Sequence, residues 1–443
     1  MPRADTRHSA PAGRLGPVRL IALLDGRVVA AVHRNAQGTV RFVYENAWRL
    51  DPDAYPVSLS MPLTAAEHGH HAITPFLWGL LPDNERTLEH YGRLFGVSAR
   101  NPVELLAHIG ADCAGAIQFA TPERAAQLEG SSGRVPQVEW LTEAEIARQL
   151  RAVREHGVPG TSLRTVGQFS LAGAQPKIAL LHERGRWGRP RGRTPTTHIL
   201  KPPSGEYAGF AENEHFCLDL AGRLELGVVR SRVLRFDNEV AVVVDRFDRA
   251  KHGGTYHRIH QEDICQALAV MPDRKYENQG GPGVADVVTL LREASGAAAD
   301  DIDRFLSVTV LNWVLAATDA HAKNYALLHG ARQAVRLAPF YDIVSFLPYA
   351  DRQLHRVKLA MKIGGEYLVR RVGSAHWTAL AGGTGLTADY VLGNARELLG
   401  VMGDAVEDTR AAAAEAGLNA KHVNALAQRI SRRVRECLKA VGG

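Results

Sequence analysis

The sequence predicts an α+β protein in which a mixed α/β N-terminal part precedes an all-helical C-terminal part. Two observations predict this class. Short apolar runs separated by turn signals fill the first 249 residues, whereas beyond about residue 250 apolar residues recur at helical spacings of three and four. The 443 residues, 45% of them hydrophobic, supply apolar material for two or three packed domains.

The first unit is expected over residues 17–155, after a disordered tail at 1–16. Residues 18–24 and 27–33 form a predicted hairpin, because Asp25-Gly26 suits the positive φ angles of a two-residue turn. Residues 39–44 add a third strand. Helices are expected from Thr74, over 103–109 after Pro102, and after Thr142, which forms a capping-box pattern with Glu145.

The second unit, residues 156–249, reads as strands within 166–181, 197–200 and 233–246, with a helix over 212–226. Between two of these strands, residues 184–193 contain five arginines and one tryptophan. Such a segment suits a solvated hairpin tip, and it also suits an RNA-binding segment.

The third unit, residues 250–443, is expected to be helical. Asp301 caps a predicted core helix that carries Phe305, Val308, Leu311 and Leu315. The last helix, 421–439, has an apolar face and a basic face, which is either solvated or able to touch a DNA backbone; the basic residues are Arg429, Arg432, Arg433 and Arg435.

Charge and cysteine usage narrow the class of protein. The net charge of +6 permits an acidic partner without requiring one. Four widely spaced cysteines, with no CxxC pair, favour a reducing cytoplasm and buried thiols over a disulfide framework or a zinc knuckle. No run of about 18 apolar residues predicts a membrane span, so we expect a cytoplasmic protein.

The strongest chemical signal is the segment 318–324, Thr-Asp-Ala-His-Ala-Lys-Asn. Phosphoryl transfer needs a carboxylate that orients the attacking hydroxyl and oxygen ligands for Mg²⁺. Asp319 and Asn324 have the D-x4-N spacing that protein kinases use, and Asp342, after an apparent strand, stands where a second metal carboxylate is expected. The same residues could instead be helix caps.

Upstream residues support the nucleotide interpretation. Residues 170–177 form a small-residue loop whose backbone N–H groups can approach phosphate, although the loop is neither a Walker A nor a GxGxxG motif. Lys201 ends a predicted strand, as a phosphate-binding lysine does. Residues 245–248 close the last strand before the helical region, where a hinge would bind adenine through its backbone.

These residues, in this order, resemble the HipA family, the serine/threonine kinase toxins of bacterial type II toxin–antitoxin modules. The resemblance covers nearly the whole chain after the tail. Further matching segments are 58–63, 79–83, 109–110, 115–116, 213–214, 247–249, 261–263, 280–283 and 358–361. It implies a two-lobed, protein-kinase-like fold with an extra N-terminal subdomain, ATP and Mg²⁺ as cofactors, and non-specific serine/threonine protein kinase activity.

The resemblance also implies residue roles. Asp319 is the expected catalytic aspartate, Asn324 and Asp342 are the expected Mg²⁺ ligands, and Ser170 is the expected autophosphorylation site. The expected nucleotide-binding residues are Ala172, Gly173, Ala174, Gln175, Lys177, Lys201, Asp245, Arg246, Phe247, Asp248, His321, Lys323, Asn324, Tyr341 and Asp342. Phosphorylated Ser170 would place a dianion where ATP phosphates belong and expel the loop.

Two positions depart from the family pattern: Ala320 stands where glycine is frequent, and Asp245 where glutamate is common. The implied partners are a helix-turn-helix antitoxin (HipB-like), operator DNA mainly through that antitoxin, and a protein substrate, expected to be an aminoacyl-tRNA synthetase such as glutamyl-tRNA synthetase. The competing interpretation is a non-catalytic corepressor that docks the antitoxin on operator DNA.

Two further hypotheses concern side chains outside this set. Glu214 lies 13 positions after Lys201, on the next predicted helix, and could pair with that lysine as a kinase helix glutamate does; it could also be a solvated carboxylate. The segment 67–71, Glu-His-Gly-His-His, could bind a metal, but it lacks HExxH spacing and we expect a loop without metal.

Overall fold

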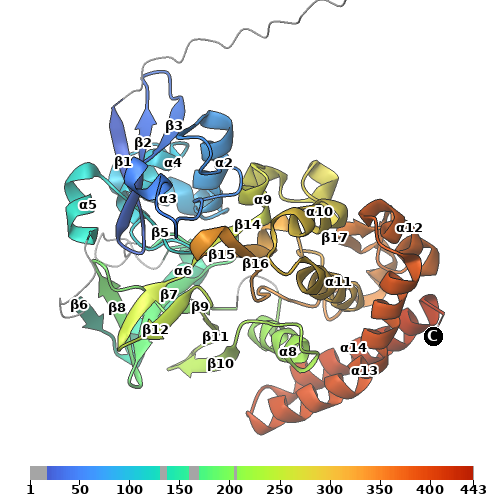
Figure 1. Ribbon diagram of the computed structural model, residues 1–443. Helices are drawn as coiled ribbons and strands as arrows, with labels where there is room; N and C mark the ends of the chain where they lie inside the picture. The colour runs from blue at the N-terminus through green and yellow to red at the C-terminus, as the bar shows by residue number, and fades with distance from the viewer. Residues whose placement is uncertain (1–16, 130–136, 159–168, 204–206, 443) are drawn as a thin grey trace, which may run out of the picture.

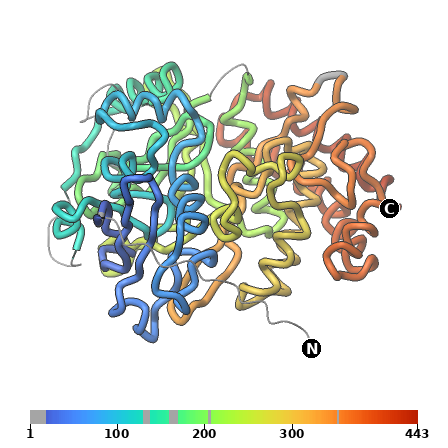
Figure 2. The backbone as a smooth tube through the Cα atoms, turned by 90° about the horizontal axis from the view of Figure 1, so that it is seen from above, coloured from blue at the N-terminus to red at the C-terminus, as the bar shows by residue number. Residues whose placement is uncertain are grey.

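The computed structural model describes residues 17–129, 137–158, 169–203 and 207–442. Three bodies follow one another along the chain in Figure 1: an N-terminal subdomain, a sheet that forms the N-lobe, and a helical lobe that forms the C-lobe. Seen from above in Figure 2, the blue N-terminal and the red C-terminal segments lie on opposite sides. The predicted tail at 1–16 and residues 166–168 of a predicted strand lie outside the described residues.

The N-terminal subdomain surrounds a five-stranded antiparallel sheet with the order β4-β3-β2-β1-β5. The predicted hairpin is present, and Asp25 and Gly26 take φ angles of 45° and 83° at its turn. The elements are β1 (Val18–Leu24), β2 (Arg27–Arg34), β3 (Val40–Tyr44), α1 (Asn46–Arg49), β4 (Glu67–His68), α2 (His70–Gly79), α3 (Glu85–Phe95), α4 (Pro102–Ile109), β5 (Ile117–Ala120) and α5 (Pro122–Leu128).

The N-lobe is a six-stranded antiparallel sheet with the order β10-β11-β9-β7-β8-β6. Its strands are β6 (Gln137–Trp140), β7 (Ile178–Glu183), β8 (Arg186–Arg191), β9 (His198–Lys201), β10 (Ser231–Phe236) and β11 (Glu239–Asp245). Helix α6 (Glu143–His156) starts at the predicted Thr142 capping box and packs Ile146, Leu150 and Val153 into the core of this sheet. β6 and α6, expected in the first unit, therefore pack with the N-lobe.

The arginine-rich segment 184–193 is a strand rather than a hairpin tip. Only Arg184 and Gly185 form the turn, and the rest of the segment contains β8. The guanidinium groups of Arg189 and Arg191 pair with Glu139 on β6 at 3.1 and 2.9 Å. These two arginines therefore hold β8 to β6.

The C-lobe is mainly helical, and α8 (Phe210–Arg223) of the N-lobe packs against its two longest helices, as Figure 1 shows. Trp313 and Trp377 form the centre of its core, with ring centroids 5.6 Å apart. The helices are α9 (Ile264–Ala267), α10 (Val284–Ala294), α11 (Ala298–Leu315), α12 (Ser374–Thr384), α13 (Ala388–Glu415) and α14 (Ala420–Ala440).

The expectation of an all-helical C-lobe was incomplete. The lobe also contains short strands: β12 (Arg249–His252), β13 (Thr255–Arg258), β14 (His260–Asp263), β15 (Ala326–Gly330), β16 (Ala334–Leu337), β17 (Lys358–Ile363) and β18 (Glu366–Leu368). Five 3₁₀ turns are described, η1 (Pro272–Arg274), η2 (Glu277–Gln279), η3 (Ala322–Asn324), η4 (Ala331–Gln333) and η5 (Asp351–Arg356). Strands this short leave too few alternating positions for a period to be recognised.

The predicted Asp301 cap is wrong. Helix α11 begins at Ala298, so Asp301 lies inside its first turn. Its buried carboxylate accepts hydrogen bonds from the Leu337 N–H at 2.8 Å and from Arg336 Nε at 3.0 Å. Asp301 therefore attaches β16 to α11, a role that depends on a tertiary contact.

The basic face of α14 is narrower than predicted. Arg433 is buried and donates to the Val369 carbonyl at 2.7 Å, and Arg429 donates to the Leu347 carbonyl at 2.8 Å. Arg432 and Arg435 are exposed.

The four cysteines are buried and unpaired, as expected. A search of the helices among the described residues finds none with the length and apolar composition to cross a bilayer.

Candidate functional site

A buried ion cluster, here called the lysine cluster, joins the lobes at the end of β9. The Nζ atom of Lys201 lies 2.6 Å from Oε1 of Glu214 on α8 and 2.6 Å from Oδ1 of Asp342. Burial lowers the pKa of Lys201, but the two carboxylates outweigh this effect and raise the pKa above its ordinary value. The ammonium therefore keeps its charge, and the hypothesised pair with Glu214 is present.

The two carboxylates of the lysine cluster differ. Glu214 is fully buried, which raises its pKa, and its Oε2 atom has no hydrogen-bond partner among the described residues. The side chain of Asp342 is 27% exposed. Burial opposes the charge of Asp342, but Lys201 and Lys177 lower its pKa below the ordinary value. The Asp342 carboxylate is thus ionised, and part of it is open to the pocket.

Asp342 has a backbone conformation that is rare outside glycine. Its φ angle is 59°, in the left-handed region, where such residues cost about 1–3 kcal/mol and persist only when neighbours hold them. The Asp342 carboxylate itself is held by Lys201 at 2.6 Å. Three residues further on, Asn213 on α8 fixes Ser345, because its side-chain oxygen accepts from the Ser345 N–H at 3.0 Å and its side-chain nitrogen donates to the Ser345 carbonyl at 2.8 Å. The strand expected before Asp342 is reduced to an isolated bridge between Phe340 and Val228.

The loop after α11 carries Asp319 at the rim of the pocket. The Nδ2 atom of Asn324 donates to the Asp319 carbonyl at 2.7 Å, so the D-x4-N spacing closes a loop on itself. The Tyr276 hydroxyl donates to Oδ1 of Asp319. His321 is buried, which lowers its pKa to about 3, so the imidazole beside Asp319 is neutral at pH 7 and contributes no positive charge.

Oxygen donors suited to a hard cation meet between these loops. Asn324 donates through Nδ2, which leaves its Oδ1 atom for a ligand, and Asp342 supplies a carboxylate. Such oxygens, together with the phosphates of a nucleotide, are the ligands that Mg²⁺ prefers. No cluster of three or more His, Cys, Asp or Glu side chains that could hold a metal occurs within the described ranges.

The segment 67–71, expected in a loop, instead contains strand β4 and the first residues of helix α2. Glu67 pairs with Arg41, His68 lies 3.0 Å from the Pro62 carbonyl, and His70 lies 3.0 Å from the Thr74 hydroxyl. These side chains are engaged in local contacts.

The loop 170–177 borders the pocket through part of its length. Ala172, Gly173 and Lys177 line the pocket, and Lys177 Nζ donates to the Ala172 carbonyl at 2.6 Å. Burial and the charge of Lys201 lower the pKa of Lys177 to about 8. Gly173 has a φ angle of 106°, and a Cβ atom there would lie 2.5 Å from Lys177 Nζ. Ala174 and Gln175 line a separate small pocket beside this one.

Ser170 lies beneath the pocket. It is 1% exposed, its Oγ donates to the Leu80 carbonyl at 2.8 Å, and its N–H donates to the Asp112 carbonyl at 3.0 Å. A phosphoryl group on Ser170 has no room in this arrangement, so the segment must leave its place before the hydroxyl can be modified.

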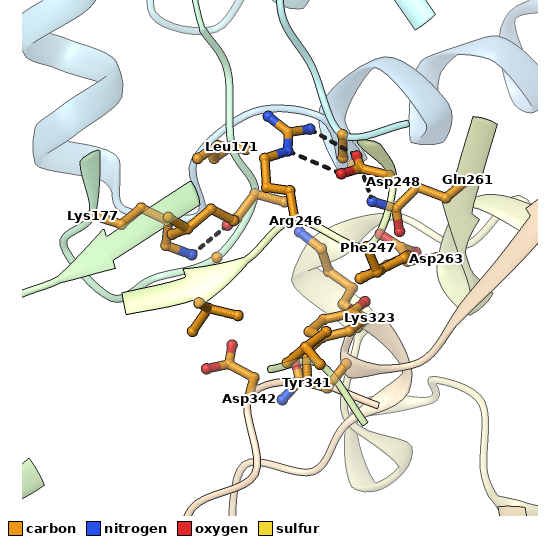
Figure 3. A pocket seen from close by; sticks show the side chains of 18 of the residues that line it. Leu171, Lys177, Arg246, Phe247, Asp248, Gln261, Asp263, Lys323, Tyr341 and Asp342 are labelled. Carbon is orange, nitrogen blue, oxygen red and sulfur yellow. Dashed lines mark hydrogen bonds and ion pairs between the residues drawn. The ribbon is translucent and has the colours of Figure 1, made fainter. Parts of the chain in front are cut away.

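The segment after β11 forms one wall of the pocket. The backbone N–H groups of Asp245 and Arg246 are engaged with the carbonyls of Arg230 and Thr197, both at 2.9 Å. The Phe247 N–H has no acceptor within the described part of the chain. The Phe247 ring stacks on Tyr341, with centroids 5.7 Å apart, and both appear together in Figure 3.

The side chains of Arg246 and Asp248 bind each other, so we do not expect them to contact a nucleotide directly. In Figure 3, Arg246 points toward Asp248, and two of its nitrogens bond that carboxylate at 2.9 and 2.7 Å. Five side chains form what we call the hinge cluster: Asp112, Arg246, Asp248, Arg249 and Arg258. The hinge cluster fastens the N-terminal subdomain to the segment after β11.

Most predicted nucleotide residues line one pocket between the lobes. They are Ala172, Gly173, Lys177, Lys201, Asp245, Arg246, Phe247, Asp248, His321, Lys323, Asn324, Tyr341 and Asp342. Asp319 does not line it, but Asn324 and His321 place it at the rim.

Several lining residues were assigned no role from sequence. Asp83 of the N-terminal subdomain reaches the pocket, as do Asp263 and Gln266 near α9. Burial raises the pKa of Asp263 to about 7. The segment 79–83 matched the family pattern, and that match was the available signal for Asp83. Its contacts span 192 and 240 positions, which no local pattern discloses.

Comparison with known families covers both parts of the chain. The model of the HipA-like C-terminal domain matches residues 169–436, and that of the HipA N-terminal domain matches residues 20–120. A Sinorhizobium fredii protein named putative kinase Y4mE is 35% identical over 390 residues, which are 87% of this chain and 91% of the relative. The serine/threonine-protein kinase toxin HipA of Shewanella oneidensis is 29% identical over 79% of each chain.

A solved structure has the same fold. A chain in the complex of Shewanella oneidensis HipA, HipB and operator DNA superposes with a TM-score of 0.80 at 24% identity, covering 95% of this chain and 97% of that one. This similarity confirms the predicted α+β, two-lobed HipA fold.

Proposed function

Because this chain belongs to the HipA family, we propose that it is an ATP- and Mg²⁺-dependent protein serine/threonine kinase of the non-specific class. The observation that carries the proposal is the Lys201 ammonium held between Glu214 and Asp342, in a pocket that also presents Asn324. A phosphate-binding lysine, its helix glutamate and two oxygen ligands for a cation are what phosphoryl transfer requires.

The proposed roles follow from position in the pocket. Lys201 binds ATP phosphates, with Lys177, Lys323 and the neutral His321 beside them. The Phe247 N–H supplies a backbone donor for adenine, and Tyr341 with Phe247 forms the apolar wall. Ala172 and Gly173 offer backbone groups to phosphate, whereas Ala174 and Gln175 support the loop from the neighbouring pocket.

Asn324 and Asp342 would hold Mg²⁺, which supplies positive charge that stabilises the phosphates during transfer. The Asp319 carboxylate orients the acceptor hydroxyl and takes its proton. Tyr276 has to release Asp319 before this step, because the Tyr276 hydroxyl donates a hydrogen bond to the same carboxylate. Asp245 contributes to the pocket through its backbone. Arg246 and Asp248 contribute through their backbone and, through their side chains, as members of the hinge cluster.

We propose that the kinase inactivates itself by autophosphorylation at Ser170. The hydroxyl is buried, so the loop must swing out before it can accept phosphate. A phosphoserine dianion can no longer occupy the place of the hydroxyl, because the Leu80 carbonyl that accepts from that hydroxyl would repel the phosphoryl oxygens. The loop, including Gly173 and Lys177, would then stay outside the pocket.

We further propose that the protein is the toxin of a type II toxin–antitoxin module. Its partners would be a HipB-like helix-turn-helix antitoxin, operator DNA mainly through that antitoxin, and a cytoplasmic substrate, an aminoacyl-tRNA synthetase such as glutamyl-tRNA synthetase. The support is the family and the solved complex of a relative with HipB and operator DNA. Phosphorylating a synthetase would arrest translation and growth.

The test is phosphoproteomics of cells after brief expression of the wild type, Asp342→Asn and Asp404→Asn. Asp404 is an exposed aspartate on α13 and serves as the matched control. We expect a phosphorylated synthetase with the wild type and Asp404→Asn and none with Asp342→Asn. If no protein is labelled in any strain, the corepressor function becomes the main one.

A further inference from the structure

Asp83 belongs to the N-terminal subdomain, but its side chain contacts the C-lobe. It lies in the connection between α2 and α3, and its Oδ2 atom is 2.7 Å from Lys275 Nζ, while its Oδ1 atom contacts Lys323 Nζ. The side chains of Asp83, Lys275 and Lys323 are 11%, 13% and 2% exposed. This is therefore a desolvated three-charge contact, and such contacts are geometrically demanding.

Both lysines adjoin groups that hold Asp319. Lys323 precedes Asn324, whose Nδ2 donates to the Asp319 carbonyl at 2.7 Å, and Tyr341 donates to the Lys323 carbonyl at 2.9 Å. Lys275 precedes Tyr276, whose hydroxyl donates to the Asp319 carboxylate. Two separate paths thus lead from the Asp83 carboxylate to Asp319.

The same connection holds the loop 170–177. The Asp83 N–H donates to the Gly173 carbonyl at 3.2 Å, and Pro82 and Gly173 form a parallel bridge. The Leu80 carbonyl accepts the Ser170 hydroxyl. Residues 80–83 are therefore in contact both with the loop 170–177 and with the loop that carries Asp319.

The charge of the Asp83 carboxylate partly balances the charges of the two lysines. Burial opposes the Asp83 charge, but Lys323 and Lys275 lower its pKa to about 2, so the carboxylate is ionised at neutral pH. One carboxylate then faces two ammonium groups. Without it, the two buried lysines repel each other and are free to move toward the phosphates of a bound nucleotide.

We propose that Asp83 is a positioning residue for the phosphoryl-transfer site: its carboxylate fixes Lys275 and Lys323, and through them the loop that presents Asp319, while its backbone holds Gly173. This inference rests on the proposed kinase function. It gives the N-terminal subdomain a part in aligning the site, although Asp83 does not touch the reacting atoms.

The first test needs no catalysis. Hydrogen–deuterium exchange of the nucleotide-free protein is compared among wild type, Asp83→Asn and the control Asp25→Asn. Asp25 also joins the N-terminal subdomain to the C-lobe, through the Arg258 N–H at 3.2 Å and His257 at 3.1 Å on β13, but does not line the pocket. Asparagine also suits its turn.

For Asp83→Asn we expect faster exchange in residues 272–279 and 319–326, and for Asp25→Asn wild-type exchange in both. Unchanged protection in Asp83→Asn would overturn the proposal. This result stands whether or not the protein transfers phosphate, so it is separable from failure of the proposed function.

The second test is steady-state kinetics on the wild-type acceptor. Because misplacing a catalytic group by about 1 Å can cost about 10²-fold, we expect kcat of Asp83→Asn to fall at least about tenfold. Its KM for ATP should not rise, since the freed lysines attract phosphate. Asp83→Glu, which keeps the charge, should recover both exchange protection and most of kcat. A merely structural role would raise KM and lower kcat together, and that outcome, or kcat equal to that of Asp25→Asn, would overturn the proposal.

Discussion

Two buried charge clusters border the pocket, and they are built differently. In the hinge cluster, each carboxylate oxygen of Asp112 and Asp248 accepts at least one hydrogen bond, and no side chain is more than 9% exposed. Within the described residues each cluster contains one buried side-chain atom without a hydrogen-bond partner, Arg249 Nε in the hinge cluster and Glu214 Oε2 in the lysine cluster. The difference lies in exposure, because the side chain of Asp342 in the lysine cluster is 27% exposed. The hinge cluster is closed to solvent, whereas the lysine cluster presents a partly exposed carboxylate to the pocket.

The difference supports a structural role for the hinge cluster and the proposed function for the lysine cluster. A closed cluster of three arginines and two aspartates holds two bodies together, and its members have few lone pairs to offer a ligand. A cluster with a partly exposed carboxylate in a pocket is a candidate site for a cation. Arg246 and Asp248 line the same pocket as Lys201, so proximity to the pocket alone does not assign function.

The largest expected effect is on catalysis, from Lys201→Met. Removing a donor that faces developing phosphate charge should lower kcat/KM for ATP about 10²–10³-fold. A steady-state kinase assay measures this, with Lys439→Met, at an exposed site on α14, as the control. Equal kcat/KM in the two variants would mean that the lysine cluster does not act on ATP.

The next effect is on stability, from Asp112→Asn. Leaving Arg246, Arg249 and Arg258 without this carboxylate should lower the free energy of unfolding by about 3–5 kcal/mol. The control is Asp51→Asn, which removes a surface pair with Arg27 and should lower the free energy of unfolding far less. Urea unfolding of both variants compares them, and equal losses would contradict the structural role of the hinge cluster.

A third effect depends on pH. Because the pKa of Lys177 is lowered to about 8, its ammonium loses its proton as pH rises through that value, and the apparent affinity for ATP should fall between about pH 7 and 9. Lys177→Arg stays charged and should flatten this part of the profile. Binding titrations at fixed ionic strength measure it; identical profiles for the two proteins would exclude Lys177 as the titrating group.

The smallest effect is expected from Glu214→Gln. The amide oxygen of the new side chain can still accept from Lys201 Nζ. The substitution also removes a buried carboxyl group whose pKa is raised by burial. Stability should therefore be unchanged or slightly higher, as thermal unfolding would show. Glu214→Ala, which removes the acceptor, should weaken the apparent affinity for ATP, and an unchanged affinity would count against the Lys201–Glu214 pair as a functional unit.

Local chemistry made part of the fold predictable from the sequence. The Asp25-Gly26 turn and the Thr142–Glu145 capping box depend on residues within four positions, so their signals are complete in the sequence. The Asp301 cap failed because the contacts of that carboxylate with Arg336 and Leu337 are 35 and 36 positions away. The short strands β12–β18 were not predicted, because each has too few residues to show an alternation of apolar and polar side chains.

The candidate site divides in the same way. Asp319, Asn324 and Lys201 follow recognisable motifs; Asn324 and Lys201 line one pocket, and Asp319 lies at its rim, where its carbonyl accepts from Asn324. The position of Ser170 beneath the pocket and the proposed function of Asp83 depend on how the N-terminal subdomain packs against both lobes. Ala174 and Gln175 show the limit of a motif, because two members of one segment face a different cavity.

The most direct measurement of the kinase account is the intact mass of the purified protein after incubation with Mg·ATP, compared between the wild type and Asp319→Asn. We predict one added phosphoryl group, on Ser170, in the wild type and none in Asp319→Asn, because Asp319 is the group that orients the hydroxyl. Equal phosphorylation of the two proteins would contradict the account.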